Sequence, residues 1–222
     1  MPDQNVLGGE LLLPISDENV VLAYYCGALG FGESDLARFL IIHIKKSDVF
    51  YDIGANYGYY GALAGMLGAE VHAFEPNPSV LPYLRKNVPN RALLNEVALA
   101  DKPGELTFSD ISASHKSGMS TLFPEILTAE ARHTQKILKV SAITLDEYVS
   151  HHSLPTIIKM DVESAEYLVL EGGRKLFSSH SPILTMEIYN GDEPAAIERT
   201  TKALSLLKEF GYASYEIGPG GE

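Results

Sequence analysis

The spacing of hydrophobic positions changes near residue 48, and the two parts of the chain predict different structures. Upstream, apolar residues recur at helical spacing and predict a helix over residues 33–44. Residues 10–24 carry two apolar runs separated by a turn-forming segment, which predicts β structure. The first part, residues 1–45, is therefore predicted to be a short β/α extension packed on a larger core. The helical apolar positions are Leu36, Phe39, Leu40 and Ile44.

From residue 48 onward, short apolar runs alternate with amphipathic segments. The runs lack strict alternation, which suits strands that are buried on both faces. This repetition predicts an α/β fold with a mostly parallel sheet and helices on both faces. Residues 46–222 are then the core of a chain that forms one domain overall. The predicted strands lie at 49–51, 71–74, 93–99, 156–160 and 183–188, and the predicted helices at 58–67, 78–88, 164–171 and 194–210.

Residues 101–143 fit this repetition least well. Two segments, 104–108 and 136–143, are predicted to be additional strands. The small polar residues of 109–121 predict a mobile loop. A last strand is expected at 212–217, near the end of the chain.

Composition and charge narrow the functional classes. The chain has 222 residues and a formal charge of −12, from 17 Lys and Arg against 29 Asp and Glu. A surface this acidic repels phosphate backbones and anionic membranes, so neither nucleic acid nor a membrane is an expected partner. Cys26 is the single cysteine, which excludes an internal disulfide and is typical of a reducing compartment. Because neither a membrane-spanning run nor a secretion signal is recognisable, the predicted location is the cytoplasm.

The first motif with chemical content is Asp52-Ile53-Gly54-Ala55-Asn56-Tyr57-Gly58. A strand ends at Asp52, a glycine-rich turn follows, and a helix begins. The two glycines let the backbone approach a ligand closely. A dinucleotide site presents bare amides to pyrophosphate, whereas a carboxylate in the turn suits a ligand that carries ammonium and sulfonium cations. A structural turn with a helix cap is the alternative.

The second motif is Glu75, which directly follows the second predicted strand. It lies about 20 residues after the glycine turn, where an acid can bind two ribose hydroxyls. Pro76 and Pro78 end the strand and start the next helix. Together with the glycine turn, Glu75 is predicted to bind a ribose, against the alternative of a solvated strand-end acid.

The third motif delivers several acids to the same edge of the sheet. Asp161 ends a buried strand, Glu163 follows in the turn, and Glu166 enters the next helix, where the helix dipole favours an acid. Glu187 ends the next strand along the chain. Because strand-end acids on neighbouring strands can converge, Asp161 and Glu187 are the predicted pair for handling the substrate, against the alternative of plain solvation.

These three motifs, followed by Leu-Thr-Met-Glu-Ile-Tyr at 184–189, resemble the FkbM family of S-adenosylmethionine-dependent methyltransferases. The resemblance extends over about residues 10–216. It implies a class I methyltransferase fold and methyl transfer to an oxygen, commonly a hydroxyl of a sugar or of a polyketide-type metabolite. Two features depart from the family pattern: Ser164 stands where glycine is usual, and no segment is found for the antiparallel strand that normally closes the sheet.

The resemblance also implies roles for individual residues toward S-adenosylmethionine. Glu75 would bind the ribose, and Asp161 would face the transferred methyl group and the acceptor. The adenine would lie near Asn95 and Val97. The methionine part would lie against Asp52, Gly54, Asn56 and Gly58.

An alcohol acceptor has a very high pKa, so a base or a metal ion should assist its reaction. Asp161 is the first candidate for the base and Glu187 the second. His115, in the polar loop, is a third candidate, against a surface histidine without a role. A Mg²⁺ ion held by Asp161, Glu163 and Glu187 is the alternative, because hard cations prefer carboxylate oxygen.

Three classes of function remain open at this point. The first is an O-methyltransferase acting on a small hydroxylated acceptor. The second is an NAD(P)-binding oxidoreductase with a Rossmann sheet, although the turn after Asp52 lacks the three-glycine spacing of such enzymes. The third is a non-catalytic module excised from a larger synthase. A homodimer or a parent multidomain enzyme is the expected assembly.

Overall fold

The structure is a computed structural model, and it describes residues 11–14, 16–17, 33–112, 117–189, 191–218 and 221. Most of the β structure predicted over 10–24 lies outside these ranges, and so does the candidate base His115. Residues 11–14 are described and form no strand, so the β part of the N-terminal prediction is wrong there. The predicted helix is present as α2 (Glu33–His43).

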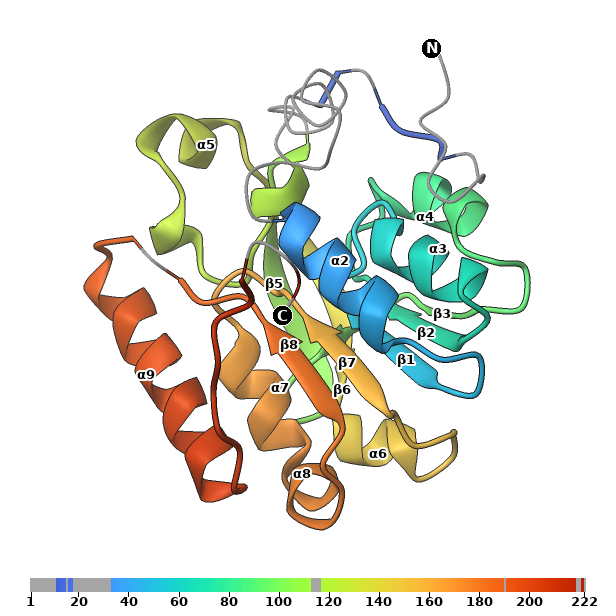
Figure 1. The fold of residues 1–222 in the computed structure, drawn as a ribbon. Coiled ribbons are helices and arrows are strands. Elements are labelled where there is room, and N and C mark those ends of the chain that lie inside the picture. The colour runs from blue at the N-terminus through green and yellow to red at the C-terminus, as the bar shows by residue number, and fades with distance from the viewer. Residues whose placement is uncertain are drawn as a thin grey trace.

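The centre of the molecule is a five-stranded sheet in which every neighbouring pair is parallel (Figure 1). The chain builds outward from β1 to β3 on one side and then returns to place β7 and β8 on the other side of β1. Strand order therefore reverses between β1 and β7, which is where open sheets of this kind bind ligands. The predicted α/β class is confirmed. From edge to edge the strands are β3 (Leu93–Asn95), β2 (Glu70–Phe74), β1 (Val49–Ile53), β7 (Ile157–Met160) and β8 (Ile183–Met186).

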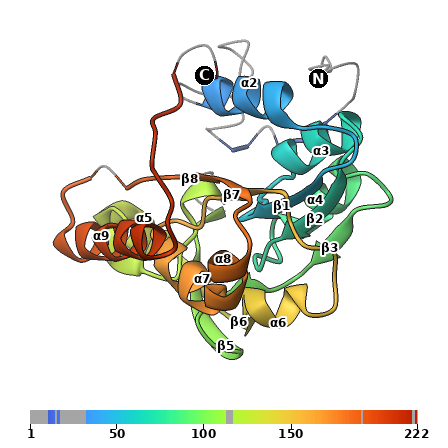
Figure 2. The same cartoon turned by 60° about the horizontal axis from the view of Figure 1, so that its bottom comes forward.

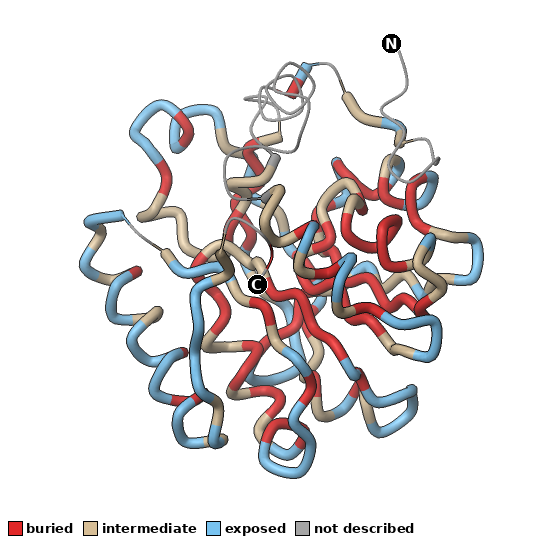
Figure 3. The backbone as a smooth tube through the Cα atoms, in the orientation of Figure 1, coloured by how far each residue is buried: buried red, intermediate tan, exposed pale blue. Residues whose placement is uncertain are grey.

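Helices cover both faces of this sheet (Figures 1 and 2). Successive side chains of a strand point to opposite faces: Phe50 belongs to the core shared with α2 and α3, whereas Tyr51 belongs to the core shared with α6 to α9. The inner strands β1, β2 and β7 are accordingly buried along most of their length, whereas the edge strands β3 and β8 are more exposed (Figure 3). No helix in the described ranges has the length and apolarity to cross a membrane. One face carries α2, α3 (Tyr59–Met66) and α4 (Leu81–Asn87), and the other carries α6 (Leu145–Val149), α7 (Glu166–Gly172), α8 (Arg174–Ser179) and α9 (Pro194–Glu209).

A second, three-stranded sheet lies beside α7 and has the order β4-β6-β5. Its strands are β4 (Ala98–Leu99), β6 (Lys136–Ile143) and β5 (Gly104–Asp110), and β5 runs antiparallel to β6. Among its described residues, the connection from β5 to β6 includes the 3-10 helices η2 (Ser117–Met119) and η3 (Pro124–Ile126) and the helix α5 (Ala129–Thr134). Both strands predicted in this region are confirmed.

Three further sequence predictions need correction. The apolar run 93–99 is not one strand, because β3 pairs with β2 while β4 pairs with β6 in the other sheet. The ends of the loop predicted at 109–121 are ordered by two backbone hydrogen bonds between Ser109 and Thr121, of 2.8 and 3.1 Å. Residues 212–217 form no strand, since they have no ladder partner among the described residues.

Candidate active site

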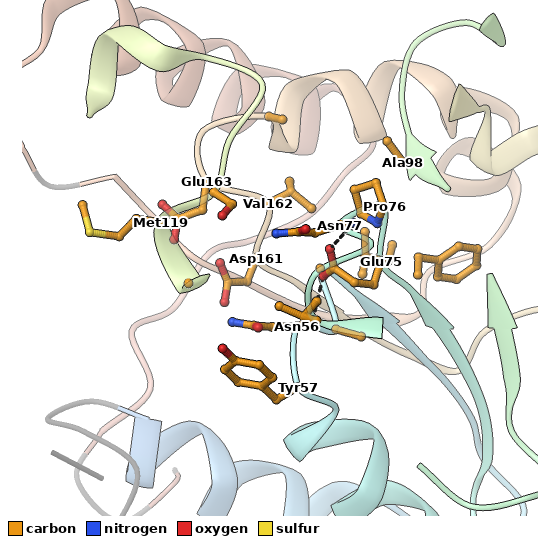
Figure 4. Close-up of a pocket in the computed structure, with 18 of the residues that line it drawn as sticks. Asn56, Tyr57, Glu75, Pro76, Asn77, Ala98, Met119, Asp161, Val162 and Glu163 are labelled. Carbon is orange, nitrogen blue, oxygen red and sulfur yellow. Dashed lines mark hydrogen bonds between the residues drawn. The ribbon is translucent and has the colours of Figure 1, made fainter. Parts of the chain in front are cut away.

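A cavity of about 420 Å³ opens at the carboxyl ends of β1, β2, β7 and β8. This is the size range of cofactor and substrate pockets in proteins. Figure 4 shows Glu75 and Asn77 on one side of it, with Asp161, Glu163 and Met119 on the other. The sequence motifs separated by more than 100 residues therefore meet around one cavity, as the shared edge of a parallel sheet requires.

The glycine turn forms the part of the wall between these two sides. Gly54 has φ +77°, and a Cβ built on it would overlap the backbone carbonyl oxygen of Asp161. Only glycine allows the turn to lie this close to the end of β7. Gly54 and Asn56 line the cavity, whereas Gly58 caps α3 with φ +86° and packs against Leu84 instead.

Glu75 lines the cavity and is 6% exposed. One carboxylate oxygen accepts the backbone N–H of Asn56 at 2.9 Å, and the other accepts the backbone N–H of Asn77 at 2.8 Å (Figure 4). Burial raises the pKa of Glu75 to about 7, against the lowering effect of these two amides. Each oxygen keeps a second lone pair, so the carboxyl is held in place and can still accept ligand hydroxyls.

Asp52 is fully buried and does not line the cavity. Its carboxylate lies 3.6 Å from Nζ of Lys159, a residue of β7 that is 3% exposed. The ammonium of Lys159 also donates to the carbonyl oxygen of Gly54 at 2.7 Å and lies 3.4 Å from the carboxylate of Asp161. Burial raises the pKa of Asp52, and Lys159 opposes this shift. Asp52 thus sits behind the glycine turn, and Lys159 joins it to Asp161.

Lys159 was missed by sequence reasoning, because one lysine within an apolar run looks like a tolerated polar position. The available signal was its place two residues before a strand-end acid, with a side chain on a strand buried on both faces. A buried ammonium requires a partner of opposite charge.

Three carboxyl groups gather on the side of the cavity opposite Glu75. The carboxylate oxygens of Asp161, Glu163 and Glu187 lie within 4.8 Å of one another. Withdrawal of its carboxyl from water and then the negative charge of Asp161 raise the pKa of Glu187 to about 8, although much of the residue is exposed. Burial and then the negative charges of Asp161, Glu187 and Glu166 raise the pKa of Glu163 well above its ordinary value. The predicted convergence of these strand-end acids is present in the structure.

The turn that carries these acids has an unusual backbone. Glu163 and Ser164 have φ of +52° and +76°, a region that non-glycine residues rarely adopt. Thr121 donates to the carbonyl oxygen of Glu163 at 2.8 Å, and Arg199 donates to the hydroxyl of Ser164 at 3.0 Å. Ser164, the departure from the family pattern, therefore occupies a glycine-like conformation that is held by a side chain of α9.

Glu166 and Asn95 have supporting roles. Glu166 accepts the backbone N–H of Val162 at 3.2 Å, and burial raises its pKa to about 7. Asn95 does not line the cavity. Its carbonyl oxygen accepts the backbone N–H of Glu75 at 3.0 Å, and its side-chain amide donates to the hydroxyl of Tyr148 in α6. Val97, in contrast, lines the cavity as predicted.

The fold is the α/β fold of class I methyltransferases. A crystal structure of methyltransferase FkbM from Methylobacillus flagellatus KT shares the fold, with a TM-score of 0.50 at 20% identity, over 76% of this chain and 38% of that one.

The family follows from the sequence comparison. A model of the methyltransferase FkbM domain matches residues 52–214, and the chain belongs to this family. Hexuronic acid methyltransferase AglP of Haloferax volcanii is 30% identical, over 80% of this chain and 70% of its own length. 31-O-demethyl-FK506 methyltransferase FkbM of Streptomyces tacrolimicus is 26% identical, over 59% of this chain and 61% of its own length. The chain is therefore an S-adenosylmethionine-dependent methyltransferase, and the comparisons do not support the oxidoreductase alternative.

The residues around the cavity fit S-adenosylmethionine. The anchored carboxyl of Glu75 suits a pair of ribose hydroxyls. The close turn at Gly54 leaves room for a ligand against the backbone, and the carboxylates on the far side suit a positively charged sulfonium.

Proposed function

We propose that this chain methylates a hydroxyl group of a sugar or of a similar small hydroxylated molecule. The proposal rests on one observation above all. The carboxyl of Glu75, which suits ribose hydroxyls, faces a group of three acids across one cavity, at the edge of the sheet where strand order reverses. The name of the AglP relative, a hexuronic acid methyltransferase, favours a sugar as the acceptor.

In this proposal the side of the cavity around Glu75 holds the nucleoside of the donor. Glu75 accepts the ribose hydroxyls, and the apolar surface of Val97, Ala98 and Phe74 covers the adenine. Gly54 and Asn56 lie against the methionine part. Asp52 acts indirectly, because its negative charge fixes Lys159 and thereby the turn.

The opposite side of the cavity is proposed to hold the acceptor. S-adenosylmethionine, when bound, supplies a methyl group on a sulfonium, and the neutral thioether that departs, S-adenosylhomocysteine, is a good leaving group. The protein mainly aligns the acceptor oxygen, and such alignment contributes about 7–11 kcal/mol. Asp161, 38% exposed in its side chain, accepts the hydroxyl proton. Glu187 lies beside it as the second candidate, and its pKa of about 8 lies near neutral pH, where proton transfer is most effective.

Mg²⁺ is a separate alternative for activating the hydroxyl. The acids Asp161, Glu163 and Glu187 offer the oxygen ligands that hard cations prefer. The proposed mechanism uses the acids as bases and needs no ion. Full activity in EDTA would favour this mechanism, and loss of activity that Mg²⁺ restores would favour the ion.

The direct test is a methyl-transfer screen with the purified protein. Labelled S-adenosylmethionine is offered together with neutral sugars, uronic acids, nucleotide sugars and polyketide-type alcohols, with and without EDTA. We expect label in at least one sugar class. If S-adenosylhomocysteine binds but no acceptor is methylated, the alternative of a non-catalytic module gains support.

Replacing Glu75 with glutamine is expected to weaken S-adenosylhomocysteine binding at least tenfold, about 1.4 kcal/mol. The amide turns one acceptor oxygen into a donor that faces a backbone N–H.

In the unmodified protein, affinity should increase as the pH rises through about 7, because ionised Glu75 accepts ribose hydroxyls at both oxygens. Isothermal titration calorimetry between pH 5.5 and 8.5 measures both effects, and equal affinity of the two proteins would refute the ribose assignment.

A further inference from the structure

Asp110 is a buried carboxylate close to the cofactor side of the cavity, but it does not line the cavity. It is the last residue of β5 and is 3% exposed. It accepts hydrogen bonds from Asn77 at 2.9 Å and from Ser79 at 2.8 Å, both in the connection between β2 and α4. It also accepts the backbone N–H and the hydroxyl of Ser112, at 2.9 and 2.6 Å. One side chain of the second sheet thus holds the turn that follows β2.

Asn77 links this carboxylate to Glu75. Its side-chain amide donates to Asp110, while its backbone N–H donates to Glu75 at 2.8 Å. Its side-chain oxygen accepts the backbone N–H of Ser79 at 2.9 Å. Asn77 is 2% exposed, and these hydrogen bonds hold both its backbone and its side chain in place. Asn77 therefore connects Asp110 to Glu75 through hydrogen bonds.

We propose that Asp110 is a positioning residue for the cofactor: it holds Asn77 so that the Asn77 backbone amide orients the Glu75 carboxyl toward the ribose hydroxyls. This inference rests on the proposed ribose-binding role of Glu75. Asp110 itself touches neither the cofactor nor the acceptor.

The charge of Asp110 strengthens this arrangement. Burial acts to raise the pKa of Asp110, but the hydrogen bonds from Ser112, Asn77 and Ser79 outweigh it, so the pKa lies below its ordinary value. The carboxylate is therefore ionised at neutral pH. Hydrogen bonds to an ionised acceptor are roughly twice as strong as neutral ones, so the contact to Asn77 is a firm one.

The experiment measures S-adenosylhomocysteine binding by calorimetry for Asp110→Ala and Asp110→Asn. Alanine removes every acceptor and should weaken binding about tenfold, whereas asparagine keeps one acceptor oxygen and should weaken it about threefold. Asp146→Asn is the matched control. Asp146 also accepts two hydrogen bonds, from the backbone N–H groups of Lys175 and Leu176 at 3.0 and 2.9 Å, but it does not line the cavity. This control should bind like the unmodified protein.

Two further readouts separate positioning from a general loss of structure. In the Glu75→Gln background, Asp110→Ala should change affinity by less than about twofold, because its effect passes through Glu75. The pH midpoint of binding should also move upward in the Asp110 variants, since the Asn77 amide lowers the pKa of Glu75. The charged neighbours Lys159, which lowers this pKa, and Asp52, which raises it, stay in place.

The possible failures are distinct. If the unmodified protein does not bind S-adenosylhomocysteine, the proposed function fails. If it binds and Glu75→Gln weakens binding, while Asp110→Asn keeps normal affinity and an unshifted pH midpoint, only the role of Asp110 is refuted. An equal loss from Asp110→Ala with and without Glu75→Gln would refute it as well. If the alanine variant does not fold, the asparagine variant alone decides the question.

Discussion

Replacing Asp161 with asparagine is expected to lower turnover by about 10²–10⁴-fold, the usual contribution of a general base. Asparagine has nearly the same shape but cannot accept the proton of the acceptor hydroxyl. The affinity for S-adenosylhomocysteine should stay within about threefold, because Glu75 on the other side of the cavity is unchanged. Turnover is measured with the acceptor found in the methyl-transfer screen, and affinity by calorimetry.

The Glu187→Gln variant is compared with Asp161→Asn to decide which of the two acids accepts the proton. If Asp161 is the base, the glutamine variant loses less activity than Asp161→Asn. Wild-type turnover of Asp161→Asn, together with a large loss in Glu187→Gln, would move the role to Glu187. Wild-type turnover of both variants would remove these acids from the mechanism.

Replacing Asp52 with alanine is expected to lower the free energy of unfolding by about 3 kcal/mol. The substitution leaves the ammonium of Lys159, which is 3% exposed, without one of its two carboxylate neighbours. Removing one partner of a buried ion pair costs more than removing both, because the remaining charge stays in a medium of low dielectric constant. Urea denaturation of the two proteins measures the difference.

Two variants serve as controls for Asp52. Glu105→Ala removes an acid that lies 3.6 Å from Lys139 with both side chains more than half exposed, and it should change stability by less than about 1 kcal/mol. The double substitution Asp52→Leu with Lys159→Met should recover part of the lost stability, since no buried charge remains. A loss below about 1 kcal/mol in Asp52→Ala would contradict the importance of this pair.

The sequence predicted most of the central sheet because its signals are local. Apolar runs of strand length alternate with segments of helical periodicity. The ends of β1, β2, β7 and β8 lie within two or three residues of the predicted ends. The run 93–99 is the exception: it is continuous in hydrophobicity, but Leu94 pairs with Ala73 in one sheet and Ala98 with Ala142 in the other. Pairing depends on distant segments, and periodicity does not report it.

The candidate site was partly predictable for a similar reason. Glu75, Asp161 and Glu187 each follow a strand directly, and parallel strands bring their carboxyl ends to one edge, so their convergence follows from the fold class. Asp110 and Lys159 were not found. Asp110 belongs to a segment whose sequence predicted a loop, and its partner Asn77 lies 33 residues earlier in the chain. Which buried polar groups meet is a property of packing.

The sequence alone determined most of the alternation of strands and helices along the chain, the chemical types at the strand ends, and the family, because these depend on residue spacing along the chain. Only the tertiary structure decided that Asp52 lies behind the glycine turn and Glu75 in the wall of the cavity. It also decided that Lys159 joins Asp52 to Asp161. The physical reason is burial: a carboxyl withdrawn from water needs a partner of opposite charge or a backbone N–H, and the fold alone places that partner.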